Sequence, residues 1–434
     1  MMRTRKFVSL VVLLALLVAA LGSVSAQDEQ IELVYWSMWN ETEGQALVIQ
    51  QWIDAFEQEH PNITISAVWN GRQNQTLVRT ALSGGTVIDL VDQDADQIAG
   101  GLMLEGMGLP LNDYLDMPAL DEDVPLREVF LPGTLDLFAL DDEIYLLPYI
   151  YNTVQFWYDR RVFDEVGVEV PTTWDEFLAV NDALREAGYA PIAAEGNEPF
   201  YSTFYLANMV ERFKGPGFLL ATSEDPTGEM WRDPVYLETS EMLRLLWDRG
   251  DIPPETLGYV WPQGQNTLAF GEAAMSLVGS WLPIELANMT DPGFEWGAFN
   301  FPGVEGGEGS VEDTQALLLS FMIMRDTEHP DEAFEFLRFI MTQENQQLMA
   351  DESLVGVTRL GVDWAEAIQD AWEAAANARY IFPDVDGVYA NHAEYLNTVL
   401  GVNYSDLWQG NITPEEFVER MATQSAEYWA NHEQ

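Results

Sequence analysis

Three aspartates alternate along a short stretch in the first quarter of the chain. Asp92, Asp94 and Asp96 have the spacing with which an EF-hand calcium loop begins. Such a loop needs glycine at its sixth position and glutamate at its twelfth, whereas this sequence has Gln97 and Met103 there. The stretch therefore predicts a polar loop that directs one carboxylate into a cleft, and not a calcium site.

Other metal and catalytic chemistry has little support in the sequence. No pair of histidines has metal-ligand spacing, which argues against a zinc site and a histidine-based triad; the four are His60, His329, His392 and His432. The chain has no Walker A, Gly-x-Gly-x-x-Gly or Gly-x-Ser-x-Gly motif. Its 72 acidic residues leave glycoside hydrolysis open, although nothing singles out two of them. We therefore predict no catalytic residue, no metal and no cofactor.

The tryptophans fall into two groups by their position in the predicted elements. Those at strand ends or in loops can stack on the apolar face of a sugar, or can equally be core residues. This group comprises Trp36, Trp39, Trp261 and Trp281. The second group is expected in packed cores and comprises Trp174, Trp247, Trp372 and Trp429.

Polar side chains beside such rings would bond the hydroxyl groups of a sugar. Arg72 follows a predicted strand, and Arg359 ends the segment Val357 to Arg359. The alternative for each arginine is a surface ion pair in a very acidic protein. The candidate ligand-binding residues are Trp39, Asn40, Glu41, Arg72, Asp94, Tyr151, Trp261, Ser280, Trp281 and Arg359.

The first part of the chain alternates strands and helices at the pitch of βαβ units. Strands are expected over Ile31 to Trp36, Ile63 to Val68 and Val87 to Val91, with helices ending near Glu59 and spanning Gln73 to Leu82. Such units form a parallel sheet, and ligands bind at the carboxyl ends of its strands. The loops at those ends are Ser37 to Glu41, Asn70 to Arg72 and Asp92 to Asp96.

The rest of the chain is richer in helices. Apolar runs predict buried strands over Ile144 to Tyr158 and Ala316 to Met324. Thr173 and Glu176 form a capping-box pattern at the start of a helix that stops at Gly188. Further helices are expected over Tyr201 to Phe213, Val235 to Asp248, Pro330 to Met349, Trp364 to Ala378, Ala393 to Leu400 and Pro414 to Trp429.

Two stretches carry a resemblance to a known family. The first is Tyr158 to Gly167, YDRRVFDEVG, followed shortly by Thr173 to Glu176, TWDE. The second is Phe270 to Trp281, FGEAAMSLVGSW. Both resemble signature segments of the family 1 extracellular solute-binding proteins of ABC importers, and the resemblance covers nearly the whole chain after its first 26 residues.

The resemblance implies an α/β clamshell of the two-lobed, type II periplasmic-binding-protein class, similar to maltose-binding protein, with a hinge of several crossovers. It implies a first lobe of residues 27–146 and 314–352 and a second of residues 147–313 and 353–434. Such a protein would capture a carbohydrate, close on it with Trp39 facing Trp281, and deliver it, as a monomer, to an ABC permease. The alternative is a secreted glycoside hydrolase or lyase using two carboxylates.

The start of the chain and its composition agree with an exported protein. Residues 1–26 have a basic start, an apolar run from Phe7 to Leu21 and small residues before a site after Ala26, which predicts a cleaved signal peptide. An uncleaved anchor is the alternative. The chain has no cysteine, which excludes disulfides and lipid attachment at the cleavage site. A net charge of −53 argues against nucleic acid and anionic membrane surfaces as partners.

Overall fold

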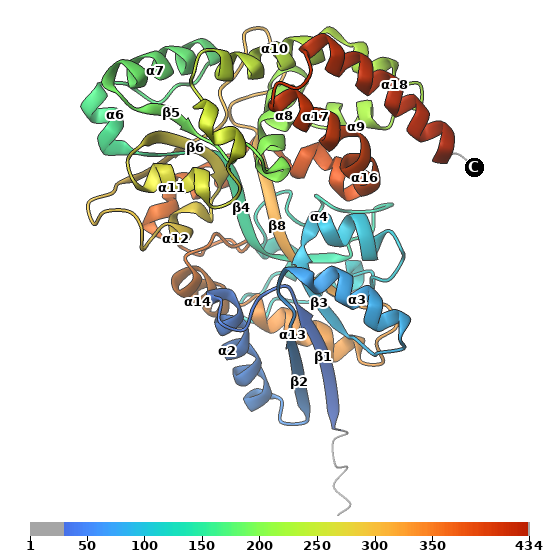
Figure 1. The fold of residues 1–434 in the computed structure, drawn as a ribbon. Helices are drawn as coiled ribbons and strands as arrows, with labels where there is room; N and C mark the ends of the chain where they lie inside the picture. The colour runs from blue at the N-terminus through green and yellow to red at the C-terminus, as the bar shows by residue number, and fades with distance from the viewer. Residues whose placement is uncertain (1–29, 433–434) are drawn as a thin grey trace, which may run out of the picture.

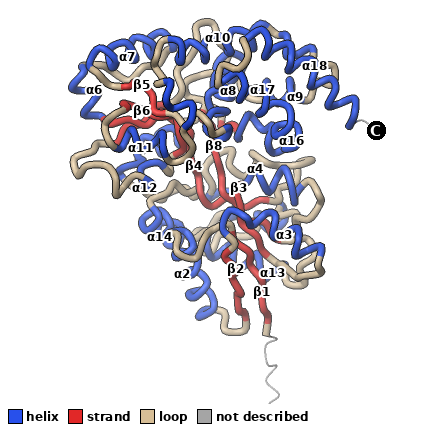
Figure 2. The backbone as a smooth tube through the Cα atoms, in the orientation of Figure 1, coloured by secondary structure: helices blue, strands red, loops and turns tan. Residues whose placement is uncertain are grey.

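A computed structural model describes residues 30–432, so the predicted signal peptide lies outside the described residues. The chain forms two lobes that are joined by long strands (Figure 1). The main sheet order is β2-β1-β3-β8-β4-β6-β5, with β7 beside β4 and β9 beside β8. Figure 2 shows β4 and β8 running between the lobes, with β1 to β3 in the lower lobe, β5 and β6 in the upper one, and helices on the outside. The predicted two-lobed α/β class is confirmed.

The lobe drawn in blue in Figure 1 begins with the predicted βαβ units. Its strands are β1 (Ile31–Ser37), β2 (Ile63–Trp69) and β3 (Leu90–Asp94), and β1 pairs in parallel with both of the others. β3 begins and ends three residues later than predicted. The reason is that Asp92 and Gln93 are buried and pair with β8, so the strand continues through polar residues. The sheet therefore delivers acidic side chains directly to its carboxyl edge.

Two strands connect the lobes. β4 (Leu146–Asp159) and β8 (Thr314–Ile323) pair antiparallel, and every residue in both is buried. Continuous apolar runs of this kind suit strands that are covered on both faces. β4 leaves β8 to pair with β6 (Ala273–Gly279) and β7 (Trp296–Phe299) in the second lobe. A third connection lies alongside, where the Tyr151 amide donates to the Gly356 carbonyl at 2.9 Å.

The second lobe confirms the capping-box prediction. Thr173 accepts from the Glu176 amide at 3.3 Å while Glu176 accepts from the Thr173 amide at 3.1 Å, and the helix α7 (Trp174–Ala187) ends at Gly188 in the left-handed region. The other long helices of this lobe are α8 (Pro199–Lys214), α10 (Pro234–Asp248) and α18 (Pro414–His432). β5 (Ala190–Ala193) pairs in parallel with β6.

The remaining helices and the last strand are shorter or lie at lobe edges. In the first lobe these are α2 (Gly44–Glu59), η1 (Gly71–Gln73), α3 (Asn74–Ser83), α4 (Ala95–Ile98), η2 (Ala99–Met103), α5 (Asn112–Leu115), η3 (Leu126–Val129), α13 (Pro330–Ile340) and α14 (Gln343–Ser353). The rest are α6 (Arg160–Val166), α9 (Phe218–Ser223), η4 (Glu229–Arg232), η5 (Pro254–Gly258), α11 (Gln263–Ala269), α12 (Leu282–Glu285), η6 (Glu366–Ile368), α15 (Gln369–Ala376), β9 (Ile381–Phe382), η7 (Asp384–Gly387), α16 (Val388–Tyr395), η8 (Leu396–Leu400) and α17 (Gly401–Trp408).

Two predicted helices are clearly wrong in their extent. The stretch expected as a helix over Ala393 to Leu400 is the middle of a longer helical run formed by α16, η8 and α17. The stretch from Pro330 to Met349 is two helices, α13 and α14, because Thr342 between them has an extended backbone.

The tryptophans expected in packed cores are only partly confirmed. Trp174 and Trp247 are buried, whereas Trp372 and Trp429 are only partly buried. Within residues 30–432, no helix is both long enough and apolar enough to cross a membrane.

Candidate functional site

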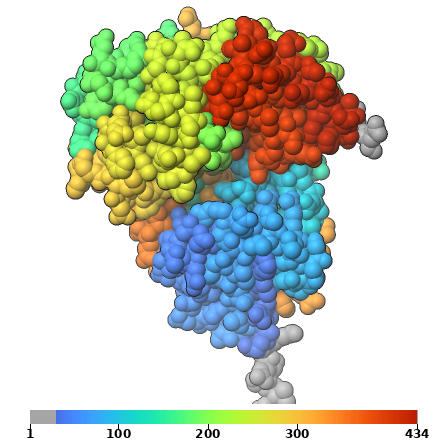
Figure 3. All heavy atoms as spheres, in the orientation of Figure 1, coloured from blue at the N-terminus to red at the C-terminus, as the bar shows by residue number. Residues whose placement is uncertain are grey.

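A cavity of about 1160 Å³ lies between the two lobes. The space-filling view shows the surface hollowed where the blue lobe faces the upper one (Figure 3). Its floor is formed by β4 and β8, through Ile150, Asn152 and Leu317 to Leu319. The loop after β1, the end of β3 and the adjoining α4 supply one wall, and α8, α12 and α16 supply the other. The expected position at the carboxyl ends of the first-lobe strands is therefore where the structure has its cavity.

Aromatic rings form part of the second-lobe wall. Trp281, directly after β6, lies with its ring centroid 6.4 Å from that of Phe200, and the two planes differ by 23°. Phe200 is 46% exposed and Trp261 is 49% exposed, so both present apolar surface to the cavity. A Cβ atom on Gly279 would lie 2.0 Å from the Trp281 ring, so a residue without a side chain is needed where that ring folds back over the strand end.

Trp39 supports the opposite wall. The residue is only 7% exposed, and its Nε1 donates to the Tyr149 hydroxyl at 2.8 Å, which in turn donates to Asp92 Oδ2 at 2.7 Å. Burial raises the pKa of Asp92 to about 6, despite these hydrogen bonds. The Arg72 guanidinium lies 4.8 Å from the Trp39 ring centroid. This network fixes the loop after β1 at the edge of the cavity.

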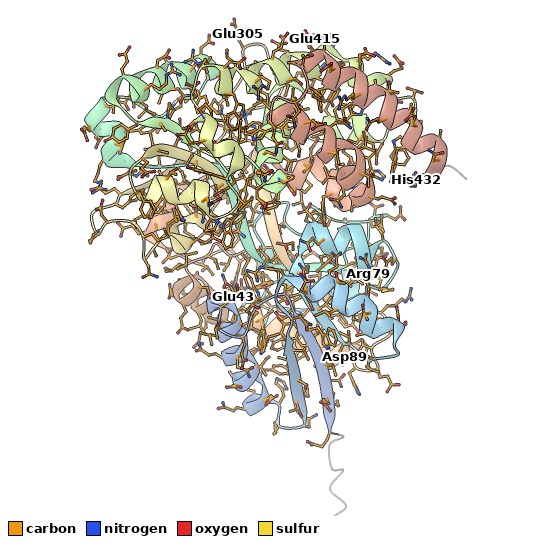
Figure 4. All side chains as sticks on the ribbon, in the orientation of Figure 1. Glu43, Arg79, Asp89, Glu305, Glu415 and His432 are labelled. Carbon is orange, nitrogen blue, oxygen red and sulfur yellow. The ribbon has the colours of Figure 1, made fainter. Side chains whose placement is uncertain are left out.

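Arg72 is neutralised by a glutamate from the same lobe. Its two terminal nitrogens donate to the Glu43 carboxylate at 2.9 Å each, and one also donates to the Met38 carbonyl at 3.0 Å. Glu43 also accepts from the Asn40 amide at 2.6 Å. Figure 4 shows Glu43 on the blue lobe, on the side that faces the upper lobe. The pair supplies directed polar groups to the cavity with no net charge.

Carboxylates gather at another part of the cavity. Asp94 ends β3, Asp96 lies in α4, and Asp384 comes from η7 of the second lobe. Asp94 Oδ2 accepts from Gln97 Nε2 at 3.0 Å, and Asp384 Oδ1 accepts from Gln315 Nε2 at 3.2 Å. Burial raises the pKa of Asp384 to about 7 and, together with the charge of Asp384, raises the pKa of Asp96 well above its ordinary value.

Six of the ten candidate ligand-binding residues line the cavity: Trp39, Asn40, Arg72, Asp94, Trp261 and Trp281. The structure places the other four elsewhere. Glu41 is an exposed turn residue outside the wall. Tyr151 is buried inside β4, where its ring centroid is 6.0 Å from that of Trp364.

The two other displaced candidates are held by the protein itself. Ser280 is buried behind Trp281 and donates to Asn152 Oδ1 at 3.2 Å. Arg359 is buried, and it pairs with Asp121 at 3.0 Å and with Glu122 at 2.6 Å. For Arg359 the ion-pair alternative is therefore correct, although the pair is buried on the arginine side. These four residues were placed in the cavity wrongly because adjacency in sequence does not fix the direction of a side chain.

Several wall residues were not among the candidates. They are Glu43, Gln93, Asp96, Phe200, Tyr201, Glu285, Asp384 and Tyr389. Phe200 and Tyr201 follow Pro199 at the start of α8, and an aromatic pair at a helix start is a signal that sequence reasoning could have used. Asp384 and Tyr389 come from a segment far along the chain, and only the tertiary fold brings them to β3.

A cavity enclosed by two lobes on crossing strands defines a solute-binding protein of the clamshell class. The sequence matches the family described as bacterial extracellular solute-binding protein over residues 39–347, and the chain belongs to that family. It is thus an extracytoplasmic binding protein. A relative is the multiple sugar-binding protein of Streptococcus mutans, 24% identical over 348 residues, which cover 78% of each chain.

Solved structures share the fold. A protein from work on xylan utilisation by Caldanaerobius polysaccharolyticus superposes with a TM-score of 0.75 at 18% identity, covering 91% of this chain and 99% of the other. RafE from Streptococcus pneumoniae, in its apo form, gives a TM-score of 0.73 at 20% identity, covering 92% and 98%. A further structure contains RafE in complex with raffinose and gives a TM-score of 0.70.

Proposed function

We propose that the protein captures a carbohydrate outside the cytoplasmic membrane and delivers it to an ABC permease. The observation that carries this proposal is the cavity itself. It combines a wall of aromatic rings, around Phe200 and Trp281, with polar groups such as the amide of Asn40 and the carboxylate of Asp94. Aromatic faces match the C–H faces of sugars, and the polar groups match their hydroxyls.

The mechanism follows from the connections between the lobes. The cavity floor belongs to β4 and β8, and the two walls belong to different lobes, so a ligand that contacts both walls favours the closed arrangement. We infer lobes of residues 27–146 with 314–352 and of residues 147–313 with 353–434, closing about these strands. The side-chain set proposed to hold the ligand is Trp39, Asn40, Arg72, Asp94, Trp261 and Trp281.

The proposal includes three further features. The protein acts as a monomer, without a lipid anchor, and without changing its ligand. The names of its relatives favour sugars: one binds multiple sugars, and RafE has been solved with raffinose. The glycoside hydrolase alternative has no support, since the family and the structural neighbours are binding proteins.

A thermal-shift screen with mono- and oligosaccharides tests the proposal. A ligand at about 100 times its dissociation constant stabilises the native state by ~2.7 kcal/mol through mass action. At least one carbohydrate should therefore raise the melting temperature in a saturable manner, whereas amino acids and polyamines in the same screen should not. If every carbohydrate leaves the melting temperature unchanged and another solute class raises it, the carbohydrate assignment is wrong.

A further inference from the structure

One part of the cavity brings together three acidic side chains that no basic side chain of the described residues pairs with. Asp94 and Asp96 approach from the first lobe and Asp384 from the second, and the latter two are 5% and 7% exposed. We name Asp94, Asp96 and Asp384 the acidic corner. Among the described residues, none of the three is in an ion pair with an arginine, lysine or histidine.

The basic side chains nearest the acidic corner form ion pairs with other carboxylates. Arg72 is held by Glu43, and Arg79 of α3, which approaches from beside Tyr389, pairs with Glu105 at 2.8 Å. Figure 4 shows Arg79 on the blue lobe, away from Glu43. The other neighbours are neutral: the amides of Gln93 and Gln97, and the hydroxyl of Tyr389 on α16.

Two acceptor atoms in this corner have no hydrogen-bond partner. Asp96 Oδ1 and Gln93 Oε1 are both buried without a donor, and both residues line the cavity. Buried acceptors are normally satisfied, because a missing hydrogen bond costs free energy. Both atoms therefore indicate that a ligand bearing N–H or O–H donors completes the corner.

The three acidic side chains of the corner favour one kind of ligand group over others. A metal ion is a poor match, since no group of three or more carboxylate, histidine or cysteine side chains in residues 30–432 is arranged to hold one. A neutral hydroxyl would supply one donor and no charge. An ammonium group supplies up to three donors and a positive charge, and hydrogen bonds between ionised partners are the stronger kind.

We propose that the acidic corner binds an amine-bearing position of the ligand, so that the site takes amino sugars in preference to neutral sugars and excludes uronic acids. This proposal rests on the proposed function and specifies the substrate subclass of the same cavity. Asp96 and Asp384 approach the ammonium group from opposite lobes, so the ligand links the lobes at the corner as well as at the aromatic wall.

Binding of a cation is coupled to proton release at this corner. In the free protein, burial and mutual repulsion raise the pKa of Asp384 to about 7 and also raise that of Asp96, so acidic solution leaves them protonated. An ammonium group favours the ionised carboxylates and expels those protons. Affinity for an amino sugar should therefore increase as the pH rises through about 7, until the amine itself loses its proton.

The test is calorimetric titration with matched sugars that differ by one group. Glucosamine, galactosamine and glucosamine oligosaccharides are compared with glucose, galactose and cello-oligosaccharides, and with glucuronic acid, at about pH 7.5. The proposal predicts that an amino sugar binds at least about tenfold more tightly than its neutral partner. Repeating the titration in buffers with different ionisation enthalpies should reveal proton release for the amino sugar and none for the neutral sugar.

Variants assign the effect to the corner. Asp96→Asn and Asp384→Asn preserve size and remove charge, so each should reduce the preference for the amine to within about threefold. Asp113→Asn makes the same change at an exposed position of α5 outside the cavity and should retain the preference.

Each outcome decides a different point. Neutral sugars that bind as tightly as their amino partners would overturn this inference and leave the proposed function intact. A preference for amines that survives in both corner variants would overturn the assignment to these residues. If no sugar of either kind binds, the proposed function is wrong and the inference with it.

Discussion

Replacing Asp384 by asparagine should stabilise the protein, and the gain should depend on pH. Asp384 is 7% exposed, and burial raises its pKa from 3.8 to about 7. The native state therefore retains a proton that the unfolded chain releases near its ordinary pKa. The contribution of Asp384 to the free energy of unfolding is then most favourable in acid and becomes less favourable as the pH rises from about 4 through about 7.

The size of the effect follows from the change in pKa between the unfolded and native states. Each pKa unit corresponds to about 1.36 kcal/mol, so a rise of about three costs on the order of 4 kcal/mol once the group is fully ionised. That figure is an upper bound because Asp384 and Asp96 titrate together. The amide that Asp384→Asn introduces carries no charge, and its oxygen can still accept from Gln315, as the Asp384 carboxyl does.

The assay is urea unfolding of wild type and Asp384→Asn at about pH 4.5 and about pH 8, without ligand. The variant should match wild type in acid and exceed it by several kcal/mol at the higher pH. Asp113→Asn, at an exposed site, should show no such difference. A variant that is less stable than wild type at pH 8, or a difference that is the same at both pH values, would refute the reasoning.

Three further predictions concern the ring wall, the lobe contact and the charge. Trp281→Ala should weaken sugar binding about fivefold or more in calorimetry, because a stacking ring contributes ~1 kcal/mol. The melting temperature should change little, since the ring is half-buried. Large destabilisation with unaltered affinity would show instead that Trp281 is a core residue. Gly100→Ala should increase the radius of gyration measured by X-ray scattering, because the added Cβ would lie 2.6 Å from the Tyr389 carbonyl oxygen of the facing lobe. Gly258→Ala, whose added Cβ would meet no atom within 4 Å, should leave the radius unchanged. An unchanged radius for Gly100→Ala would mean that this contact does not set the angle between the lobes. The melting temperature of wild type should rise between ~0.01 and ~1 M NaCl, because salt screens the repulsion among 72 acidic and few basic residues; a flat or falling curve would contradict this.

Local pattern was enough to predict most of the elements. The βαβ order, the buried strand ending in Tyr158 and Asp159, and the Thr173 capping box depend on residues close in sequence, and each is present in the structure. The extension of β3 through Asp92 was missed because the strand is held by its pairing with β8, which is a long-range contact. Propensity alone disfavours aspartate in a strand.

The site was harder to predict than the fold. Residues at or just after strand ends, such as Trp39 and Asp94, lie in the cavity wall as predicted, because the strand ends position them. Arg359 was misplaced because its partners, Asp121 and Glu122, lie more than 200 residues away in sequence. Asp384 was missed for the same reason, since it reaches the cavity only through the packing of η7 beside β8.

Equilibrium dialysis against a mixture of oligosaccharides and amino-oligosaccharides is the most direct test of the central claim. The purified protein is dialysed to equilibrium, and the retained sugars are released by denaturation and identified by mass spectrometry. We expect one sugar or a small set to be enriched to about one molecule per chain at saturation and to be recovered intact. Retention of no sugar, or recovery of shortened products that accumulate with time, would contradict it.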